Sequence, residues 1–292
     1  MLDYAKVRNW RSAEVRHAYS PRDVMLYALG VGMAQDPLDR EELRYVTENN
    51  LRVLPSMAAV LGSPGFWIRD NPEVGIDYVR LVHGEQSVTL LKPLPAGGTL
   101  LGTTRVTRVV DKGAGKGALV HSEKTLSDAA SGALVATCES VTFCRADGGF
   151  SANGGGDAPG PAPKATPATP PELTLDFQTR PETALIYRLS GDINPLHSDP
   201  DVAAKAGFAA PILHGLATYG VACHGLIKGY CGYEPARLKS ISARFSAPTY
   251  PGDLIRLECW KMGDEVAFRA RVPAAGSGWC RVTDCSPCTR RT

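Results

Sequence analysis

The chain lacks the features that would assign it to a membrane, a secretory route or nucleic acid. No apolar stretch approaches the roughly 20 residues that a helix needs to cross a bilayer. The N-terminus, Met1–Arg8, has no apolar secretory segment. The formal charge is only +2 without a long run of Lys or Arg, so the clustered positive charge that nucleic acids require is missing. We expect a soluble, cytoplasmic protein with no membrane or nucleic-acid partner.

The chain also lacks a cysteine pattern typical of a disulfide framework or a zinc site. Five of its eight cysteines stand singly in apolar stretches, where a reducing compartment favours buried thiols: Cys138, Cys144, Cys223, Cys231 and Cys259. The tail carries Cys280, Cys285 and Cys288 without a nearby fourth ligand. We predict no metal site, and an altered or disordered terminus after residue 273.

One internal segment lacks large apolar and aromatic residues, and it separates the chain into two parts. Residues 151–171 contain no aromatic residue and no Val, Ile, Leu or Met, and Gly, Pro and Ala fill most of the segment. Such a segment has no apolar side chains whose burial could offset the conformational entropy lost when the chain becomes ordered. We therefore predict a linker. The chain of 292 residues, 43% of them hydrophobic, suffices for two units. We place these units at 1–150 and 172–292.

The two predicted units resemble each other. Segments 87–100 and 242–254 each hold a strand, a turn rich in Pro and Gly, and a second strand. Alternating runs continue at 99–110, 117–126 and 133–143 in the first unit, and at 254–262 and 265–272 in the second. A closing strand is also expected beyond 272. An internal duplication is the simplest interpretation.

Each unit also contains one apolar segment with helical character, at 23–33 and at 215–227. The second segment holds several glycines, each of which costs a helix about 1 kcal/mol relative to alanine. Glycines at these positions predict close packing against a sheet. We therefore expect an α+β fold in which a curved antiparallel sheet wraps around one helix, formed twice.

Residues 187–203, YRLSGDINPLHSDPDVA, carry the strongest chemical signal. The turn formers around Gly191 and Pro195 predict a rigid loop that fixes Asp192, Asn194 and His197 relative to one another. A carboxyl and an imidazole suit hydration, in which water loses one proton while an α-carbon gains one. From the residues alone, the spacing favours turn formers and a helix cap over catalytic side chains.

The same stretch resembles the signature of the MaoC-like, type-2 enoyl-CoA hydratases. That signature has an aromatic residue, a spacer, Ser-Gly-Asp-x-Asn-Pro-Leu-His and a later Ala, matched here by 187, 190–192, 194–197 and 203. Further segments between residues 10 and 272 resemble the same family: 23–32, 54–62, 83–86, 92–95, 211–215 and 243–252. The resemblance implies a double hotdog fold.

The resemblance also implies an activity and roles for individual residues. The activity would be reversible hydration of a trans-2-enoyl-CoA to (R)-3-hydroxyacyl-CoA by a homodimer, with coenzyme A as part of the substrate and no other cofactor. His197 would deprotonate the water and Asp192 would protonate the α-carbon, or the reverse. Asn194 would help to hold the water.

Negative charge on the thioester oxygen requires a further group. A helix N-terminus offers unpaired N–H groups with partial positive charge, and Gly215 opens the second apolar helix. We predict the Gly215 N–H as the oxyanion donor, although the glycine is also interpretable as a simple helix start.

Four other residues are candidates for contact with the substrate: His83, Gly84, His214 and Arg244. The segment His83-Gly-Glu-Gln86 is either structural or substrate-lining, and Arg244 is either a contact to a CoA phosphate or a solvated surface charge. The competing functions are dehydration on acyl carrier protein, thioester hydrolysis and acyl-CoA binding without catalysis.

Overall fold

The computed structural model describes residues 1–161 and 166–273. The predicted altered terminus, the tail cysteines and the predicted closing strand lie outside these residues. The five singly placed cysteines are buried free thiols, as predicted. In the described part of the chain, no helix combines the length and the apolar character needed to cross a membrane.

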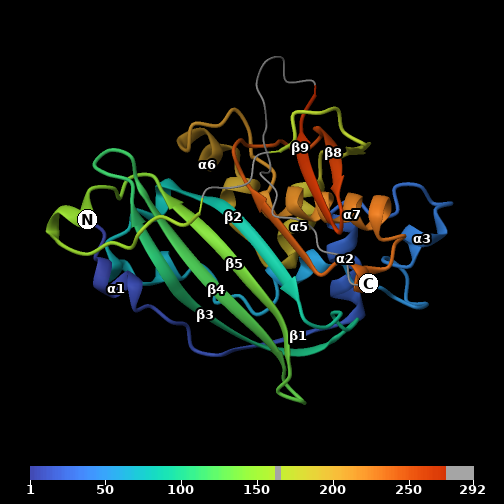
Figure 1. The fold of residues 1–292 in the computed structure, drawn as a ribbon, viewed down its shortest axis with the longest axis horizontal. Coiled ribbons are helices and arrows are strands. Elements are labelled where there is room, and N and C mark those ends of the chain that lie inside the picture. The colour runs from blue at the N-terminus through green and yellow to red at the C-terminus, as the bar shows by residue number, and fades with distance from the viewer. Residues whose placement is uncertain (162–165, 274–292) are drawn as a thin grey trace.

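The larger of two antiparallel sheets forms most of the N-terminal half (Figure 1). Its neighbouring strands, in spatial order, are β1 (Val15–Tyr19), β3 (Gly98–Asp111), β4 (Ala118–Asp128), β5 (Leu134–Cys144), β2 (Leu81–Leu90) and β7 (Ser240–Arg244). The strands predicted at 99–110, 117–126 and 133–143 are confirmed. Strand β7 comes from the C-terminal half and pairs with β2, so the two halves share this sheet.

The smaller sheet has the order β6 (Leu173–Gln178), β8 (Leu254–Met262) and β9 (Glu265–Arg271). This order repeats β1-β3-β4 of the first half, and β7 follows the helix of its half as β2 follows α2, which supports the predicted duplication. The strands predicted at 254–262 and 265–272 are confirmed to within one residue.

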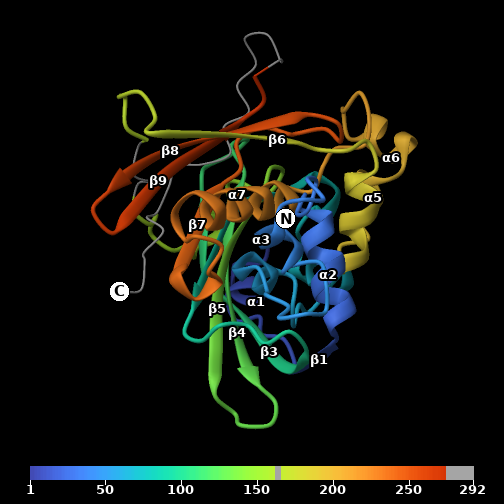
Figure 2. The ribbon, with the colours of Figure 1, turned by 90° about the vertical axis from the view of Figure 1, so that its right-hand side faces the viewer.

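Helix α7 (Gly215–Tyr230) is the long central helix of the C-terminal half, and it confirms the predicted apolar helix. Figure 2 shows it running beneath the smaller sheet. Its glycines allow this approach: a Cβ on Gly225 would collide with Leu257, and one on Gly229 would lie 2.5 Å from Leu173. A Cβ on Gly220 would collide with Val31 of the other half. The prediction of close packing is confirmed.

The corresponding helix of the first half, α2 (Pro21–Gly30), ends three residues before the predicted end at Met33. Gly32 and Ala34 have φ values of 83° and 60°, and this left-handed backbone breaks the helix. The predicted end of this helix was therefore wrong, while the helix begins two residues before the predicted segment. The remaining helical segments are short: α1 (Tyr4–Arg8), α3 (Arg40–Leu43), η1 (Pro55–Ala59), α4 (Trp67–Asp70), η2 (Pro72–Val74), η3 (Tyr78–Arg80), η4 (Phe150–Asn153), α5 (Thr183–Tyr187), η5 (Arg188–Ser190), η6 (Pro195–His197), α6 (Pro200–Lys205) and η7 (Pro235–Arg237).

The predicted linker is fastened to the first half at several residues, among which Asp157 makes the most contacts. The Asp157 N–H donates to the Val109 carbonyl at 2.8 Å, and its carboxylate accepts from the Val109 N–H at 2.7 Å. Tyr4 Oη donates to the other carboxylate oxygen at 3.2 Å. The described part of 151–171 is thus irregular but anchored. The division into 1–150, 151–171 and 172–292 remains a prediction.

A buried ionic cluster ties the two halves together behind α7. Glu42, on α3, is 4% exposed, and its Oε1 lies 2.8 Å from Lys228 Nζ and 3.1 Å from His224 Nε2 on α7. Burial alone raises the pKa of Glu42, but the hydrogen bonds from His224 and Lys228 outweigh it and hold the pKa at about 2. The folded state therefore favours the ionised carboxylate.

We expect Glu42→Ala to lower the free energy of unfolding by about 3 kcal/mol at pH 7, because it leaves the buried His224 without its hydrogen-bond partner and removes the shorter of the two ion pairs of Lys228, which is 38% exposed. The folded pKa of Glu42 lies below the unfolded value, so its contribution is complete above about pH 4.5 and is lost as the pH falls toward about 2. The difference from wild type should shrink by roughly half at pH 3. Glu41→Ala, at an exposed position, is the control. An equal loss at pH 7 and pH 3 in denaturant titrations would contradict this role.

Candidate active site

The loop that follows α5 is held by its own turn-forming residues. Gly191 has a φ of 116°, which only glycine adopts readily. The Asn194 N–H donates to Asp192 Oδ1 at 3.2 Å, and the Leu196 N–H donates to Asn194 Oδ1 at 3.1 Å. These hydrogen bonds and the left-handed glycine define the path of the loop; its predicted rigidity remains a prediction. Asn194 Oδ1 already accepts a hydrogen bond as the cap of η6. The predicted contact of Asn194 with water is therefore assigned to its side-chain nitrogen, Nδ2.

His197 is buried, with 8% of its surface exposed, and has a defined tautomer. Its Nδ1 lies 2.9 Å from the Ile212 carbonyl oxygen. Because a carbonyl only accepts hydrogen bonds, Nδ1 carries the proton and Nε2 keeps its lone pair in the neutral ring. Burial lowers the pKa of His197, although the Ile212 hydrogen bond and the charge of Asp192 oppose this shift. A neutral imidazole with a free lone pair suits a general base.

Three titratable side chains converge on this loop. Asp192, His197 and His214 each offer an atom, and these atoms all lie within 4.8 Å of one another. The structure therefore brings the predicted carboxyl and imidazole together. His214 is 1% exposed, its Nε2 lies 3.1 Å from the Asp192 carbonyl oxygen and its ring stacks on that of His197. Its predicted contact with the substrate remains a prediction.

The stacking of the two imidazoles disfavours a shared metal ion. Their ring centroids are 3.7 Å apart and their planes differ by 26°. A metal binds an imidazole nitrogen near the ring plane at about 2.1 Å. Two nearly parallel planes at this separation do not meet within that distance. The arrangement suits acid–base chemistry better than metal binding.

The first half contributes to the site through the pairing of β2 with β7. The Phe245 N–H donates to the Gly84 carbonyl at 2.8 Å, at a bulge in β2 between His83 and Glu85. Such a bulge re-aims the neighbouring side chain. The ring of His83 meets that of Phe245 edge-on, with centroids 5.1 Å apart. Burial lowers the pKa of His83, and the charge of Asp192 is among the opposing effects. His83 and Gly84 thus lie near the loop that carries Asp192 and His197.

Gly215 is the first residue of α7 and lies beside the same aromatic ring. A Cβ added to Gly215 would be 3.5 Å from the Phe245 ring, an ordinary contact distance. Within the described residues, no hydrogen-bond acceptor is found for its N–H. This N–H is thus available at a helix N-terminus, where the helix dipole favours negative charge.

Arg244 stands apart from the convergent group. Its side chain is 49% exposed and its Nε lies 3.8 Å from Glu85 Oε1, also at the surface. Its predicted contact with a CoA phosphate remains a prediction. Two partners in the site were not predicted: the Ile212 carbonyl and the Phe245 ring. A backbone acceptor leaves no signal in the sequence, whereas Phe245 stood in a segment already matched to the family.

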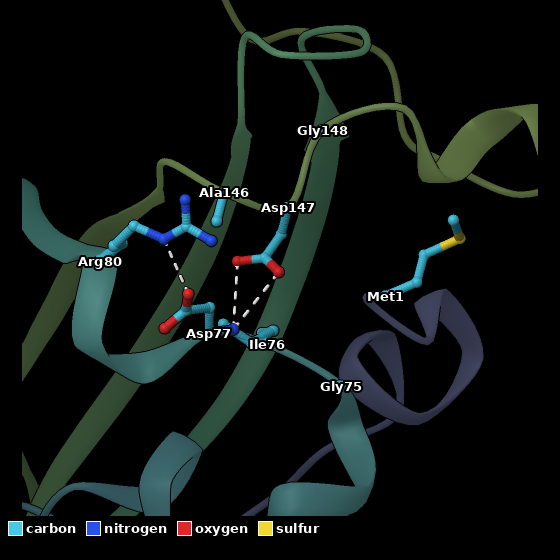
Figure 3. A pocket seen from close by; sticks show the side chains of 8 residues that line it. All are labelled: Met1, Gly75, Ile76, Asp77, Arg80, Ala146, Asp147 and Gly148. Atoms are coloured by element: carbon cyan, nitrogen blue, oxygen red, sulfur yellow. Dashed lines mark hydrogen bonds and ion pairs between the residues drawn. The ribbon is translucent and has the colours of Figure 1, made fainter.

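A separate cavity of about 440 Å³ lies in the first half (Figure 3). It is lined by Met1, Gly75, Ile76, Asp77, Arg80, Ala146, Asp147 and Gly148. Inside it, both carboxylate oxygens of Asp147 lie 3.3 Å from the Asp77 N–H. None of the predicted site residues lines this cavity, so it is distinct from the convergent group.

Two family models match the chain in succession. The model described as MFE-2 hydratase 2 N-terminal domain matches residues 17–146, and the model described as MaoC like domain matches residues 161–278. The catalytic loop falls in the second match, and His83 and Gly84 fall in the first. The two matches together span both halves of the predicted duplication.

Individual proteins agree with the models. A peroxisomal enoyl-CoA hydratase 2 of Arabidopsis thaliana is 37% identical over 272 residues, which cover 89% of this chain and 87% of that protein. The crystal structure of a MaoC-like dehydratase from Phytophthora capsici superposes with a TM-score of 0.83, at 32% identity and full coverage of both chains. A Mycobacterium tuberculosis protein described as having a double hotdog fold, 15% identical with a TM-score of 0.55, covers 97% of this chain and 96% of that one and shares the fold. The chain is thus a double hotdog protein that belongs to the MaoC-like, type-2 enoyl-CoA hydratase family.

Proposed function

We propose that this protein is a hydro-lyase that adds water reversibly to trans-2-enoyl-CoA and yields (3R)-3-hydroxyacyl-CoA. The observation that carries the proposal is the convergence of Asp192 and His197 on one loop, next to His214 and the Gly215 N–H, for which no acceptor is found among the described residues. Membership of the hydratase family and the activity named for the Arabidopsis relative support it. The (R) configuration rests on the family alone.

The proposed roles follow from the neutral state of His197. Its free Nε2 takes a proton from the water whose oxygen attacks the β-carbon. That proton passes from the imidazole to the Asp192 carboxylate, which delivers it to the α-carbon, so both groups return to their starting state and the net change is the addition of H and OH. The reverse assignment of acid and base is the alternative, because both groups share one water. Asn194 assists in holding this water.

The Gly215 N–H would stabilise the developing negative charge on the thioester oxygen, since a preorganised donor at a helix N-terminus acts where charge forms. His83 and Gly84 would line the thioester end of the substrate, and Arg244 would contact the phosphates of CoA. The first half, which lacks the catalytic loop, would accommodate the acyl chain. No cofactor beyond the CoA of the substrate is required by this chemistry.

Two properties of the whole protein remain part of the proposal. We infer a cytoplasmic homodimer, in line with the sequence analysis. The described residues include no helix suited to cross a membrane, while the Arabidopsis relative is named as peroxisomal. The acyl-CoA substrate follows from the activity named for that relative.

Crotonyl-CoA separates the proposed reaction from hydrolysis. A hydratase removes the enoyl absorbance without releasing free thiol, whereas a thioesterase releases CoA thiol. We expect loss of absorbance alone, with a slower reaction on crotonyl-acyl carrier protein. Thiol release at the same rate would identify a thioesterase, a faster reaction on the carrier protein would identify its dehydratase, and binding without either change would identify a non-catalytic protein.

A further inference from the structure

We propose that His214 is a positioning residue that holds both members of the catalytic pair, rather than a contact to the substrate. This inference rests on the proposed hydratase function, because it gives His214 a task within that reaction. His214 lies at the N-cap of α7, between the catalytic loop and Gly215, and is 1% exposed. Its ring contacts the loop in two independent ways.

The first contact is a hydrogen bond to the backbone of Asp192. His214 Nε2 lies 3.1 Å from the Asp192 carbonyl oxygen, so Nε2 carries the proton in the neutral ring. Among the described residues, Nδ1 then has no hydrogen-bond partner. A buried nitrogen without a partner is unfavourable for stability. This hydrogen bond fixes the position of the Asp192 backbone relative to the N-terminus of α7.

The second contact is the stack of His214 on His197. The two rings are 3.7 Å apart at 26°, while Tyr187 packs on His214 with centroids 5.0 Å apart and tilted by 49°. His197 is thus held at Nδ1 by Ile212 and across its face by His214. Rotation of the His197 ring requires both contacts to break. The Nε2 lone pair that accepts a proton therefore points in one direction.

The stack is compatible with catalysis only while His214 is uncharged. Burial, reinforced by His197 and opposed by Asp192, lowers the pKa of His214 to about 4. Arg188 acts in the same direction as His197. At neutral pH the stacked partner of His197 is therefore a neutral ring, which does not repel a proton arriving at His197.

Three substitutions at His214 separate the two contacts. His214→Ala removes both, His214→Phe keeps a ring for the stack, and His214→Gln keeps a donor for the Asp192 carbonyl. We expect kcat on crotonyl-CoA to fall about 100-fold in His214→Ala, since small displacements of catalytic groups have effects of this size. His214→Phe and His214→Gln should each recover about 10-fold of this loss. KM should stay within about 3-fold in all three, because the residue does not touch the substrate.

His224 provides the matched control. It lies on the same helix, is also 1% exposed, bonds through Nε2 to Glu42 and likewise leaves Nδ1 without a partner among the described residues. It stands ten residues further along α7, about 15 Å from His214. His224→Phe should lower thermal stability as much as His214→Phe while kcat stays near that of wild type.

A second readout does not depend on turnover. The ring ¹⁵N shifts of His197 report its tautomer, which should be the single Nδ1-protonated form in the wild type and in His224→Phe. In His214→Ala the signals should broaden or indicate a mixture. An unchanged His197 tautomer together with a wild-type kcat in His214→Ala overturns the inference. A rise in KM with unchanged kcat also overturns it, because that result assigns His214 to substrate binding. Should the wild type fail to hydrate crotonyl-CoA, the proposed function fails while the ¹⁵N comparison still decides the role of His214.

Discussion

Asp192→Asn and His197→Ala are each expected to lower kcat on crotonyl-CoA by up to about 10⁴-fold, the range of a lost general acid or base. The amide that replaces the Asp192 carboxyl can still accept a hydrogen bond from the Asn194 N–H, so the loop should keep its shape. His197→Ala removes the lone pair that takes the proton and leaves the Ile212 carbonyl to water. Steady-state rates and thermal unfolding of both variants test these expectations.

Asp199→Asn is the control for Asp192→Asn. Asp199 lies seven residues further along, and its Oδ1 accepts from the Asp201 N–H at 2.9 Å, as Asp192 accepts from the N–H two residues on. Asp199 also accepts from the Val202 N–H as the N-cap of α6, and asparagine can keep both bonds, so both substitutions exchange a carboxylate acceptor for an amide but only one affects the convergent group. We expect Asp199→Asn to keep a rate close to that of wild type. Comparable rates in the Asp192 and Asp199 variants would remove Asp192 from the mechanism.

Gly215→Pro is expected to lower kcat about 10²- to 10³-fold, because it removes the N–H proposed as the oxyanion donor. The fold should tolerate the substitution. Gly215 is the first residue of α7, where proline is favoured, and His214 already has the extended backbone, φ −59° and ψ 134°, that a residue before proline prefers. Thermal unfolding should therefore change little while turnover falls.

Gly215→Ala is the matched variant that keeps the N–H. Its Cβ would lie 3.5 Å from the Phe245 ring, an ordinary contact, so we expect turnover within about 10-fold of wild type. The prediction is a large difference between proline and alanine in kcat, not in stability. If the two variants turn over equally, the effect at Gly215 is steric and the oxyanion donor lies elsewhere.

Much of the fold was predictable because it depends on local patterns. Alternation identified the strands at 99–110, 117–126, 133–143 and 254–262 almost to the residue, since one face of each strand is buried. Glycines in 215–227 predicted a helix in close contact with a sheet, which α7 confirms at Leu257. The first helix was predicted to end three residues too late, because apolar composition does not reveal the left-handed backbone at Gly32 and Ala34.

The site was predictable only where its residues adjoin one another in sequence. Asp192, Asn194 and His197 stand on one loop, and their proximity followed from the turn formers around them. The stacking of the His214 ring on His197 was not predictable, because nothing in the sequence shows which rings meet in space. The position of His83 depends on the pairing of β2 with β7, which joins strands more than 150 residues apart. Such long-range register is not encoded in either strand alone.

Hydration of crotonyl-CoA in D₂O tests most directly whether one water is shared by the two catalytic side chains. Asp192 and His197 reach the substrate from a single loop, with their functional atoms within 4.8 Å. The hydroxyl and the α-deuterium should therefore be added to the same face of the double bond. We predict one diastereomer of the 2-deuterated product, with both new groups on that face and the (R) configuration at the hydroxyl carbon. Addition to opposite faces, or a mixture of diastereomers, would contradict the account.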